Sequence, residues 1–343
     1  MDSTTAGTPA STETLPSGRT MKAIIRDRYG SADVLHLSEL EVPEVGDEEV
    51  LVRVRAAGLE RGAWHMMAGL PYLIRIAGYG LRRPKTAGLG SELAGVVEAV
   101  GANVTGIAPG EAVFGTCSAS FAEYAVTEPD KLARMPANLD FEHAAAVPVS
   151  AVTALQALRD HGRLRAGQRV LVIGASGGVG TFAVQIAKAL GANVTGVAST
   201  PKVDLVRALG ADQVIDYTRA DITDDGRRYD VVLDIGGNRP LSRLRRVLTG
   251  DGTLVIVGGE GGGRWTGGIH RQLGAMVLTL FLRQRLGTFI AKTNSTDLDT
   301  LRALIEAGSV TPAVDRVIAL EEVPGAIRDL IAGRVRGKVV IAT

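Results

Sequence analysis

The chain has 343 residues, of which 45% are hydrophobic and 22% charged, a composition typical of a globular protein long enough for two domains. Its 38 basic and 37 acidic residues give a net charge of +1, so the sequence predicts neither a nucleic-acid partner nor a membrane partner. The single cysteine, Cys117, excludes an intrachain disulfide and a zinc site made of several cysteines, and it is typical of a cytoplasmic protein.

The first part of the chain predicts a disordered tail followed by a β-rich domain. Residues 1–20 are rich in Ser, Thr and Pro and lack the apolar run of a signal peptide. Apolar runs or alternating apolar residues then follow at Met21–Ile25, Glu49–Arg55 and Leu93–Val100. Glycine-containing turns separate these stretches, so we expect short strands arranged as a barrel.

From Phe141 the pattern changes to alternating helices and strands. The apolar runs Arg169–Ile173, Asn193–Ala198 and Val231–Ile235 are separated by segments with helical periodicity. Short strands buried on both faces between amphipathic helices are typical of a parallel, doubly wound sheet. The last predicted strand, Lys338–Ala342, resembles the strands of the first domain.

We therefore predict a cofactor domain at residues 144–290, inserted between two pieces of one other domain at residues 21–143 and 291–343. Within the inserted part, the longest apolar stretch, 272–282, is too short to cross a bilayer, and the wider segment 272–290 is interrupted by arginines. We expect this segment to be a lid or a subunit contact.

A glycine-rich loop at the start of the inserted domain predicts a dinucleotide site. In Val170–Gly180 an apolar strand runs into the loop and then into a helix, whose N-terminus attracts a pyrophosphate. Gly177 lets the backbone approach the ligand, and Gly180 lets the helix pack on the strand, whereas Ala175 replaces the usual first glycine. The predicted cofactor-binding residues here are Ala175, Ser176, Gly177, Gly178, Val179, Gly180 and, after a later strand, Gly258.

The end of the second strand of this domain predicts NADPH as the cofactor. NAD-binding proteins usually place a carboxylate there, which binds the ribose hydroxyls. This chain has Ser199, Thr200 and Lys202 instead, and Tyr217 lies one strand further on. Two hydroxyls and an ammonium suit the 2′-phosphate of NADPH.

These motifs resemble the medium-chain dehydrogenase/reductase superfamily and, within it, the zinc-independent quinone oxidoreductase-like branch. The most specific stretches are Leu89–Val97, Ala145–Ala154, Val170–Gly180 and Gly337–Val340. The resemblance implies an α/β protein with a GroES-like β-barrel catalytic domain and a Rossmann doubly wound parallel-sheet cofactor domain. It also implies that Lys202 and Tyr217 contact the 2′-phosphate, and that the protein is a homodimer.

The positions that bind catalytic zinc in other members of the superfamily lack suitable residues here. The corresponding residues are Glu60, Ser91 and Ser150, and a structural zinc lobe would need four cysteines where only Cys117 exists. Because tetrahedral zinc needs three or four protein ligands at proper spacing, we predict no metal.

Without a metal, a conjugated acceptor is easier to reduce than a plain ketone, since hydride adds at carbon and charge spreads onto a distant oxygen. The resemblance implies quinones, enones or alkenals as small-molecule acceptors. Tyr72 and His65 are the candidate catalytic residues. Two alternatives remain open: a carbonyl reductase or alcohol dehydrogenase with one of these two as proton donor, and an NADPH-binding sensor or scaffold without turnover.

Overall fold

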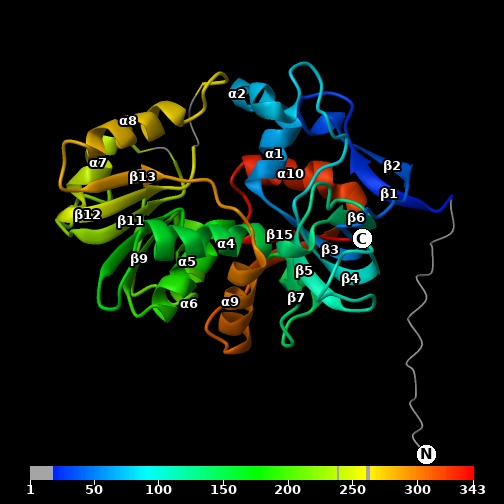
Figure 1. Ribbon diagram of the computed structural model, residues 1–343. Coiled ribbons are helices and arrows are strands. Elements are labelled where there is room, and N and C mark those ends of the chain that lie inside the picture. Colours follow the sequence, from blue (N-terminus) through cyan, green and yellow to red (C-terminus); the bar gives the residue numbers. More distant parts are fainter. Residues whose placement is uncertain (1–17, 238, 260–262) are drawn as a thin grey trace, which may run out of the picture.

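The computed structural model describes residues 18–237, 239–259 and 263–343, which form two halves lying side by side (Figure 1). The half on the right contains a sheet with strand order β14-β15-β3-β4-β5-β7, and β6 pairs with β3. Its strands are β3 (Val50–Leu59), β4 (Glu92–Val100), β5 (Ala112–Thr116), β6 (Tyr124–Thr127), β7 (Leu132–Arg134), β14 (Val314–Ala319) and β15 (Lys338–Ala342). A hairpin of β1 (Thr20–Ile25) and β2 (His36–Glu41) lies at its outer edge.

This half contains segments from the first and last parts of the sequence, because β15 pairs antiparallel with β3. Its helices are α1 (Arg61–Ala68), α2 (Tyr72–Ile74), the turn η2 (Arg75–Tyr79), α3 (Phe141–Ala145) and α10 (Val323–Ile331). The barrel-like first domain predicted from the strand pattern is confirmed.

The other half contains a parallel sheet with strand order β10-β9-β8-β11-β12-β13. The strands are β8 (Arg169–Ile173), β9 (Asn193–Ala198), β10 (Gln213–Asp216), β11 (Tyr229–Asp234), β12 (Leu248–Ile256) and β13 (Arg285–Thr288). The helices around it are α4 (Pro148–Gln156), α5 (Gly178–Ala189), α6 (Val203–Ala208), α7 (Leu241–Arg246) and α8 (Ile269–Thr279). Helix α9 (Ser295–Glu306) instead contacts α4 and, in the other half, β7.

Alternate side chains of β8 explain why helices cover both faces of this sheet. Val170 and Val172 pack in one buried cluster with Phe182 of α5, whereas Leu171 packs in another with Leu244 of α7. Successive side chains of a strand point to opposite faces, so an apolar run needs a helical layer on each side. The doubly wound parallel sheet predicted from the sequence is confirmed.

The predicted tail, residues 1–20, extends too far. β1 begins at Thr20, and the guanidinium of Arg19 forms an ion pair with Glu98 at 2.6 Å. Backbone pairing of Thr20 with Glu41 therefore places the start of the first half before the predicted Met21. Residues 1–17 lie outside the described residues.

The boundary predicted between residues 143 and 144 falls inside α3. Ala144 and Ala145 are fully buried, and α3 packs against β3, β4 and β15. This helix belongs by its packing to the first half, so the chain changes halves between α3 and α4.

The segment 272–290, which we expected to be a lid or a subunit contact, belongs to the half with the parallel sheet. It contributes most of α8 and the edge strand β13, which pairs with β12 over Thr253–Ile256. Only Leu286 of β13 is buried, so this strand lacks the apolar run by which its neighbours were recognised. In the described part of the chain, no helix is both long and apolar enough to cross a membrane.

Candidate active site

The glycine loop lies at the carboxyl end of β8, where the parallel sheet meets α5. Gly174 has a φ of 87°, which few other residues adopt, and it turns the chain away from the strand. Gly177 is the N-cap of α5, and no side chain caps this helix. The N–H groups of the first helical turn lack intrahelical partners, so they can bind a phosphate.

The glycines near this loop differ in what a side chain would meet. A Cβ at Gly177 would have only the Gly174 oxygen nearby, at 3.6 Å, so the space in front of it is open, as a pyrophosphate requires. A Cβ at Gly180 would lie 2.1 Å from the same oxygen, and one at Gly258 would lie 2.1 Å from the Ile235 oxygen. Close backbone packing thus accounts for Gly180 and Gly258, and cofactor contact by Gly258 stays a prediction.

Of the remaining loop residues, two pack in the core and one contacts the other half. Ala175 is fully buried, and Val179 packs against the core beside it. The backbone N–H of Gly337, just before β15, donates to the Ser176 oxygen at 2.8 Å. The last strand of the barrel half therefore fixes the loop of the cofactor half.

A buried ion pair lies directly beneath the loop. Lys338 donates to Glu92, and both side chains are almost completely buried. A Cβ at Gly178 would meet Lys338 Cδ at 3.0 Å and Ser150 Oγ at 3.1 Å, so this pair supports the start of α5. Burial raises the pKa of Glu92, and the Lys338 ammonium opposes that rise.

The residues predicted to bind the 2′-phosphate gather at the carboxyl ends of β9 and β10. Ser199 is partly exposed, and Tyr217 is exposed beside it, with its N–H donating to the Ala198 oxygen at 3.1 Å. The Lys202 ammonium donates to the oxygens of Gly333 at 2.7 Å and Val335 at 2.6 Å. Burial lowers the pKa of Lys202.

A carboxylate that the sequence analysis missed also lies here. Asp216 ends β10 in register with Ala198, and its Oδ2 accepts from the Thr200 hydroxyl at 2.6 Å. Asp216 also accepts from the N–H and hydroxyl of Thr218, at 3.0 and 2.7 Å. The Thr200 bond is the main cause of the lowered pKa of Asp216. Thr200 is thus engaged by a carboxylate, which could only be found from strand order.

Arg336 is a second residue that the sequence analysis missed. It is exposed, precedes the Gly337 that binds Ser176, and lies close enough to Lys202 to help lower its pKa. Two cations from different halves thus flank one end of the glycine loop. Only the pairing of Gly337 with the loop reveals this, since residues 202 and 336 are far apart in the chain.

The two candidate catalytic residues follow β3 and lie on short helices. Nδ1 of His65 hydrogen-bonds with the Leu70 oxygen at 2.7 Å, which leaves Nε2 for another partner. The Tyr72 N–H donates to the Arg264 oxygen at 2.8 Å, and its ring packs edge-on against Trp265 at 5.2 Å. Tyr72 is therefore where the barrel half touches the segment before α8.

The positions of catalytic zinc ligands are brought together without forming a metal site. Ser91 donates to Glu60 at 3.5 Å, and the N–H of Ser150 donates to Glu92 at 3.2 Å. The described residues contain no group of three or more His, Cys, Asp or Glu side chains suited to a metal. Burial raises the pKa of the Cys117 thiol to about 12, which keeps it protonated. Zinc does not fit these residues.

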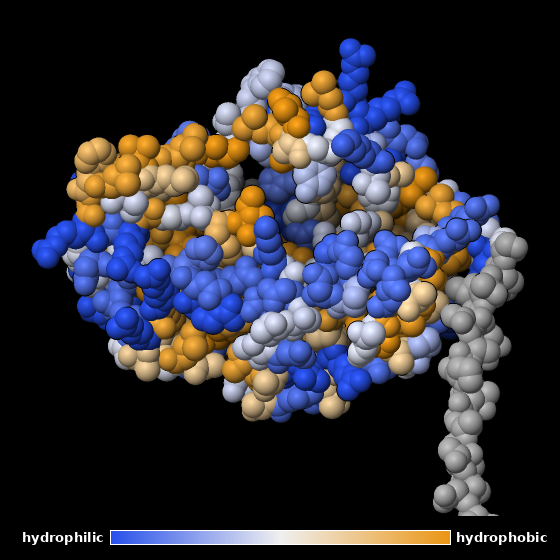
Figure 2. All heavy atoms as spheres, in the orientation of Figure 1, coloured by the Kyte–Doolittle hydropathy of each residue, from blue (hydrophilic) through white to orange (hydrophobic). Residues whose placement is uncertain are grey.

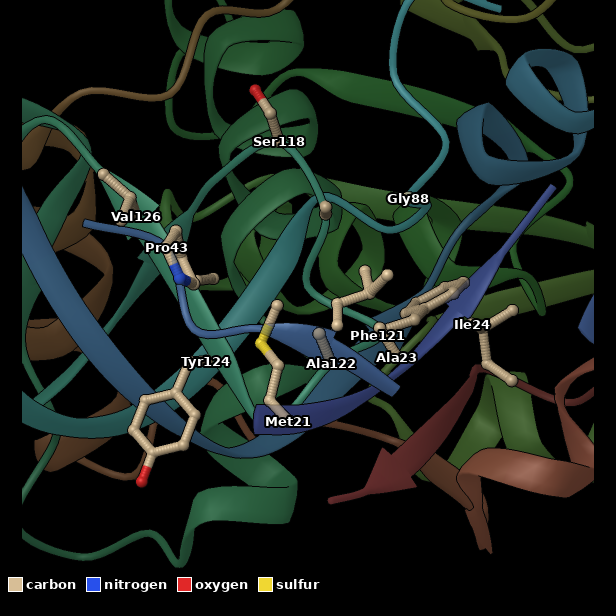
Figure 3. Close-up of a pocket in the computed structure, with 13 residues that line it drawn as sticks. Met21, Ala23, Ile24, Pro43, Gly88, Ser118, Phe121, Ala122, Tyr124 and Val126 are labelled. Carbon is tan, nitrogen blue, oxygen red and sulfur yellow. The ribbon is translucent and has the colours of Figure 1, made fainter. Parts of the chain in front are cut away.

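An apolar pocket of about 250 Å³ lies elsewhere, between β1 and residues 118–126 (Figure 3). Met21, Phe121 and Ala122 line it. None of the predicted site residues lies among its lining residues, so we do not assign it to the active site.

Two family models match the chain. Residues 46–137 match the alcohol dehydrogenase GroES-like domain, and residues 209–341 match the zinc-binding dehydrogenase model. The second match begins after the glycine loop and covers β10 to β13 of the parallel sheet and the end of the chain. Glu60 and Ser91, at two of the zinc positions, lie within the first match.

Whole-length relatives place the chain more narrowly. A quinone oxidoreductase of Pseudomonas aeruginosa is 34% identical over 91% of this chain and 97% of its own. A chloroplastic NADPH-dependent alkenal/one oxidoreductase of Arabidopsis thaliana is 32% identical over 94% and 79%. The solved quinone oxidoreductase of Coxiella burnetii superposes with a TM-score of 0.84 at 26% identity, covering 95% of this chain and all of that one. The chain therefore belongs to the medium-chain dehydrogenase/reductase superfamily, in its quinone oxidoreductase-like branch.

Proposed function

We propose that this protein is a zinc-independent, NADPH-dependent oxidoreductase that reduces a conjugated, electron-poor acceptor such as a quinone, enone or alkenal. The observation that carries the proposal is an open glycine loop at Gly177, combined with Glu60, Ser91 and Ser150 where zinc ligands would be needed. Relatives named for quinones and for alkenals or alkenones support the acceptor class.

A bound reduced nicotinamide would supply the hydride. The first turn of α5 would hold the pyrophosphate through backbone N–H groups, and Lys202 would pair with the 2′-phosphate. Ser199, Tyr217 and Arg336 would complete that phosphate site. At the acceptor end, Tyr72 would donate a hydrogen bond to the acceptor oxygen and solvent could supply the proton, and His65 is the second candidate donor.

An acceptor screen tests the proposal. Purified protein is mixed with NADPH and, in turn, a quinone, a 2-alkenal and an unconjugated ketone, and NADPH absorbance is followed with and without EDTA. We expect turnover with at least one conjugated acceptor, at the same rate in EDTA. Turnover restricted to the plain ketone would favour the carbonyl reductase, and tight NADPH binding with no turnover at all would favour the sensor or scaffold.

We further propose a homodimer, a cytoplasmic location and a cofactor domain bounded near residues 147 and 290. The outer edge of β13 pairs with no other described strand, and such edges are common sites of association. Sedimentation at several protein concentrations tests the dimer. A monomer at micromolar concentration would contradict it.

A further inference from the structure

Positive charge is concentrated in two segments of the chain. Residues 61–91 contain five Arg or Lys and no acidic residue, and the same is true of residues 261–296. Together they carry ten positive charges, whereas the net charge of the whole chain is +1. The rest of the chain is therefore net negative, and the near-neutral total conceals a polarised distribution.

Contacts join the two segments into one surface, although they belong to different halves. The Tyr72 N–H donates to the Arg264 oxygen at 2.8 Å, and the Leu73 N–H donates to the Trp265 oxygen at 3.4 Å. Helices α2 and α8, one from each segment, lie along the top of the molecule in Figure 1. We call residues 72–85 and 263–285 the roof face.

Most cations of the roof face have no protein partner in the described part of the chain; the exceptions are Arg75, which donates to the Gly69 and Ala68 oxygens, and Arg271, which pairs with Asp234. Six exposed side chains make neither an ion pair nor a side-chain hydrogen bond with another described residue: Arg82, Arg83, Lys85, Arg264, Arg283 and Arg285. Exposed cations elsewhere, such as Arg159 and Arg334, pair with neighbouring aspartates. The charge of the roof face is thus available to an external anion.

Hydrophobic side chains gather on the same face. Eleven of the fifteen large hydrophobic residues exposed in the described structure belong to the two acid-free segments. Leu273, Met276, Val277 and Leu280 form a stripe along α8 at helical spacing, and this stripe faces outward. Leu280 and Phe281 are 77% and 79% exposed. Figure 2 shows hydrophobic atoms along the upper rim, over α8 and around α2, with hydrophilic side chains projecting beside them.

We propose that the roof face docks on an anionic lipid surface. An exposed apolar stripe flanked by arginines is the composition that inserts into the headgroup region of a bilayer while its cations bind lipid phosphates. A second copy of this chain fits less well on the roof face itself, because a symmetric contact would place the same unpaired cations opposite one another. The dimer proposed above would instead use the backbone edge of β13. The expectation of no membrane partner rested on the net charge of the whole chain, which does not report on this face.

Docking here would serve the proposed reaction. Figure 2 shows a hollow between the two halves, beneath the roof face, and Tyr72 lies where the halves meet. Apolar quinones and enones dissolve in bilayers, so a roof face on the lipid would bring this hollow to its acceptors. The docking itself requires neither cofactor nor turnover, and it is tested without them.

Vesicle co-sedimentation tests the proposal on the full chain. One set of vesicles is phosphatidylcholine alone, and the other contains about 30% phosphatidylglycerol. We expect binding to the anionic vesicles that weakens as salt is raised, and at least tenfold weaker binding to the neutral ones. The proposal is wrong if the protein sediments to the same extent without vesicles, or if it binds neither vesicle type at low salt.

Matched variants identify the surface. Arg82→Gln with Arg83→Gln removes two roof charges and is expected to weaken anionic-vesicle binding about 25-fold, at about fivefold per charge. Arg163→Gln with Arg165→Gln removes two exposed charges before β8, outside the roof face, and is expected to leave binding within twofold. Equal losses in both pairs would show only nonspecific attraction and would contradict the assignment.

The exposed hydrophobic side chains of the roof face are tested separately. Leu280→Ser with Phe281→Ser is expected to weaken vesicle binding at least tenfold while NADPH affinity and the sedimentation coefficient stay unchanged. If this variant instead turns a dimer into a monomer, the face is an interface between copies and the lipid proposal is wrong.

Discussion

The pyrophosphate end and the acceptor end of the active site are built in different ways. At the pyrophosphate end, Gly174, Gly177 and Gly180 fall within seven consecutive residues, and backbone geometry alone shapes the site. At the acceptor end, Tyr72 meets Trp265 from a segment almost 200 residues away. A site made by local backbone is encoded by spacing, whereas one made by distant side chains depends on the whole fold.

Substituting neighbouring glycines gives the largest expected effect and tests the first half of this comparison. Gly177→Val places a side chain in open space, so we expect unchanged thermal unfolding but at least 100-fold weaker NADPH binding. Gly180→Val drives a Cβ against the Gly174 oxygen, so we expect a stability loss above about 3 kcal/mol. Calorimetric titration and thermal denaturation measure the two effects. Similar behaviour of both variants would contradict the division of roles.

The 2′-phosphate site combines neighbouring residues, such as Ser199 and Lys202, with the distant Arg336, so in its construction it lies between the two ends. Its cations allow a test of cofactor choice. Lys202→Ala is expected to weaken NADPH binding ten- to hundredfold and to leave NADH nearly unaffected, since a charge-assisted bond to phosphate contributes about 1.5–3 kcal/mol. Arg336→Ala should act in the same direction, because it lies beside Lys202.

The contacts of Lys202 supply a competing explanation. Its ammonium already holds the Gly333 and Val335 oxygens, so it could serve only to join the two halves. If Lys202→Ala weakens NADPH and NADH equally while Arg336→Ala changes neither, that structural role is the correct one and the NADPH assignment fails.

The same contrast explains what the sequence could and could not predict. The parallel sheet was predictable because Val170–Ile173 and its counterparts are apolar on both faces. The strand β13 was missed because Leu286 is its only buried residue. Asp216 and Arg336 were missed because strand order and a single backbone bond at Gly337, not sequence distance, bring them to the site.

At the acceptor end, Tyr72→Phe distinguishes the proposed reaction from its alternative. With a conjugated acceptor, charge spreads over the acceptor and solvent can supply the proton, so we expect kcat to fall less than about tenfold. A carbonyl reductase that depends on Tyr72 would lose about 10²–10⁴-fold. The measurement is kcat over a range of pH, with NADPH affinity as a control for folding. A loss above about 100-fold with a quinone would give Tyr72 a larger role than the proposed mechanism allows.

The smallest effect is expected at Cys117, whose N–H donates to the Ser91 oxygen at 2.9 Å near the acceptor end. Burial raises its pKa to about 12, so at pH 8 only about one molecule in ten thousand carries the reactive thiolate. The folded-state pKa lies above the unfolded value of about 8.5, so the stabilising contribution of the neutral thiol is complete below about pH 8.5 and is lost as pH rises toward 12. We expect iodoacetamide to label the native protein at pH 8 at least 100-fold more slowly than the denatured protein, as measured by mass spectrometry, and Cys117→Ser to keep activity within twofold. Rapid native labelling that also inactivates the protein would place a reactive thiol at the acceptor end, contrary to the chemistry proposed for it.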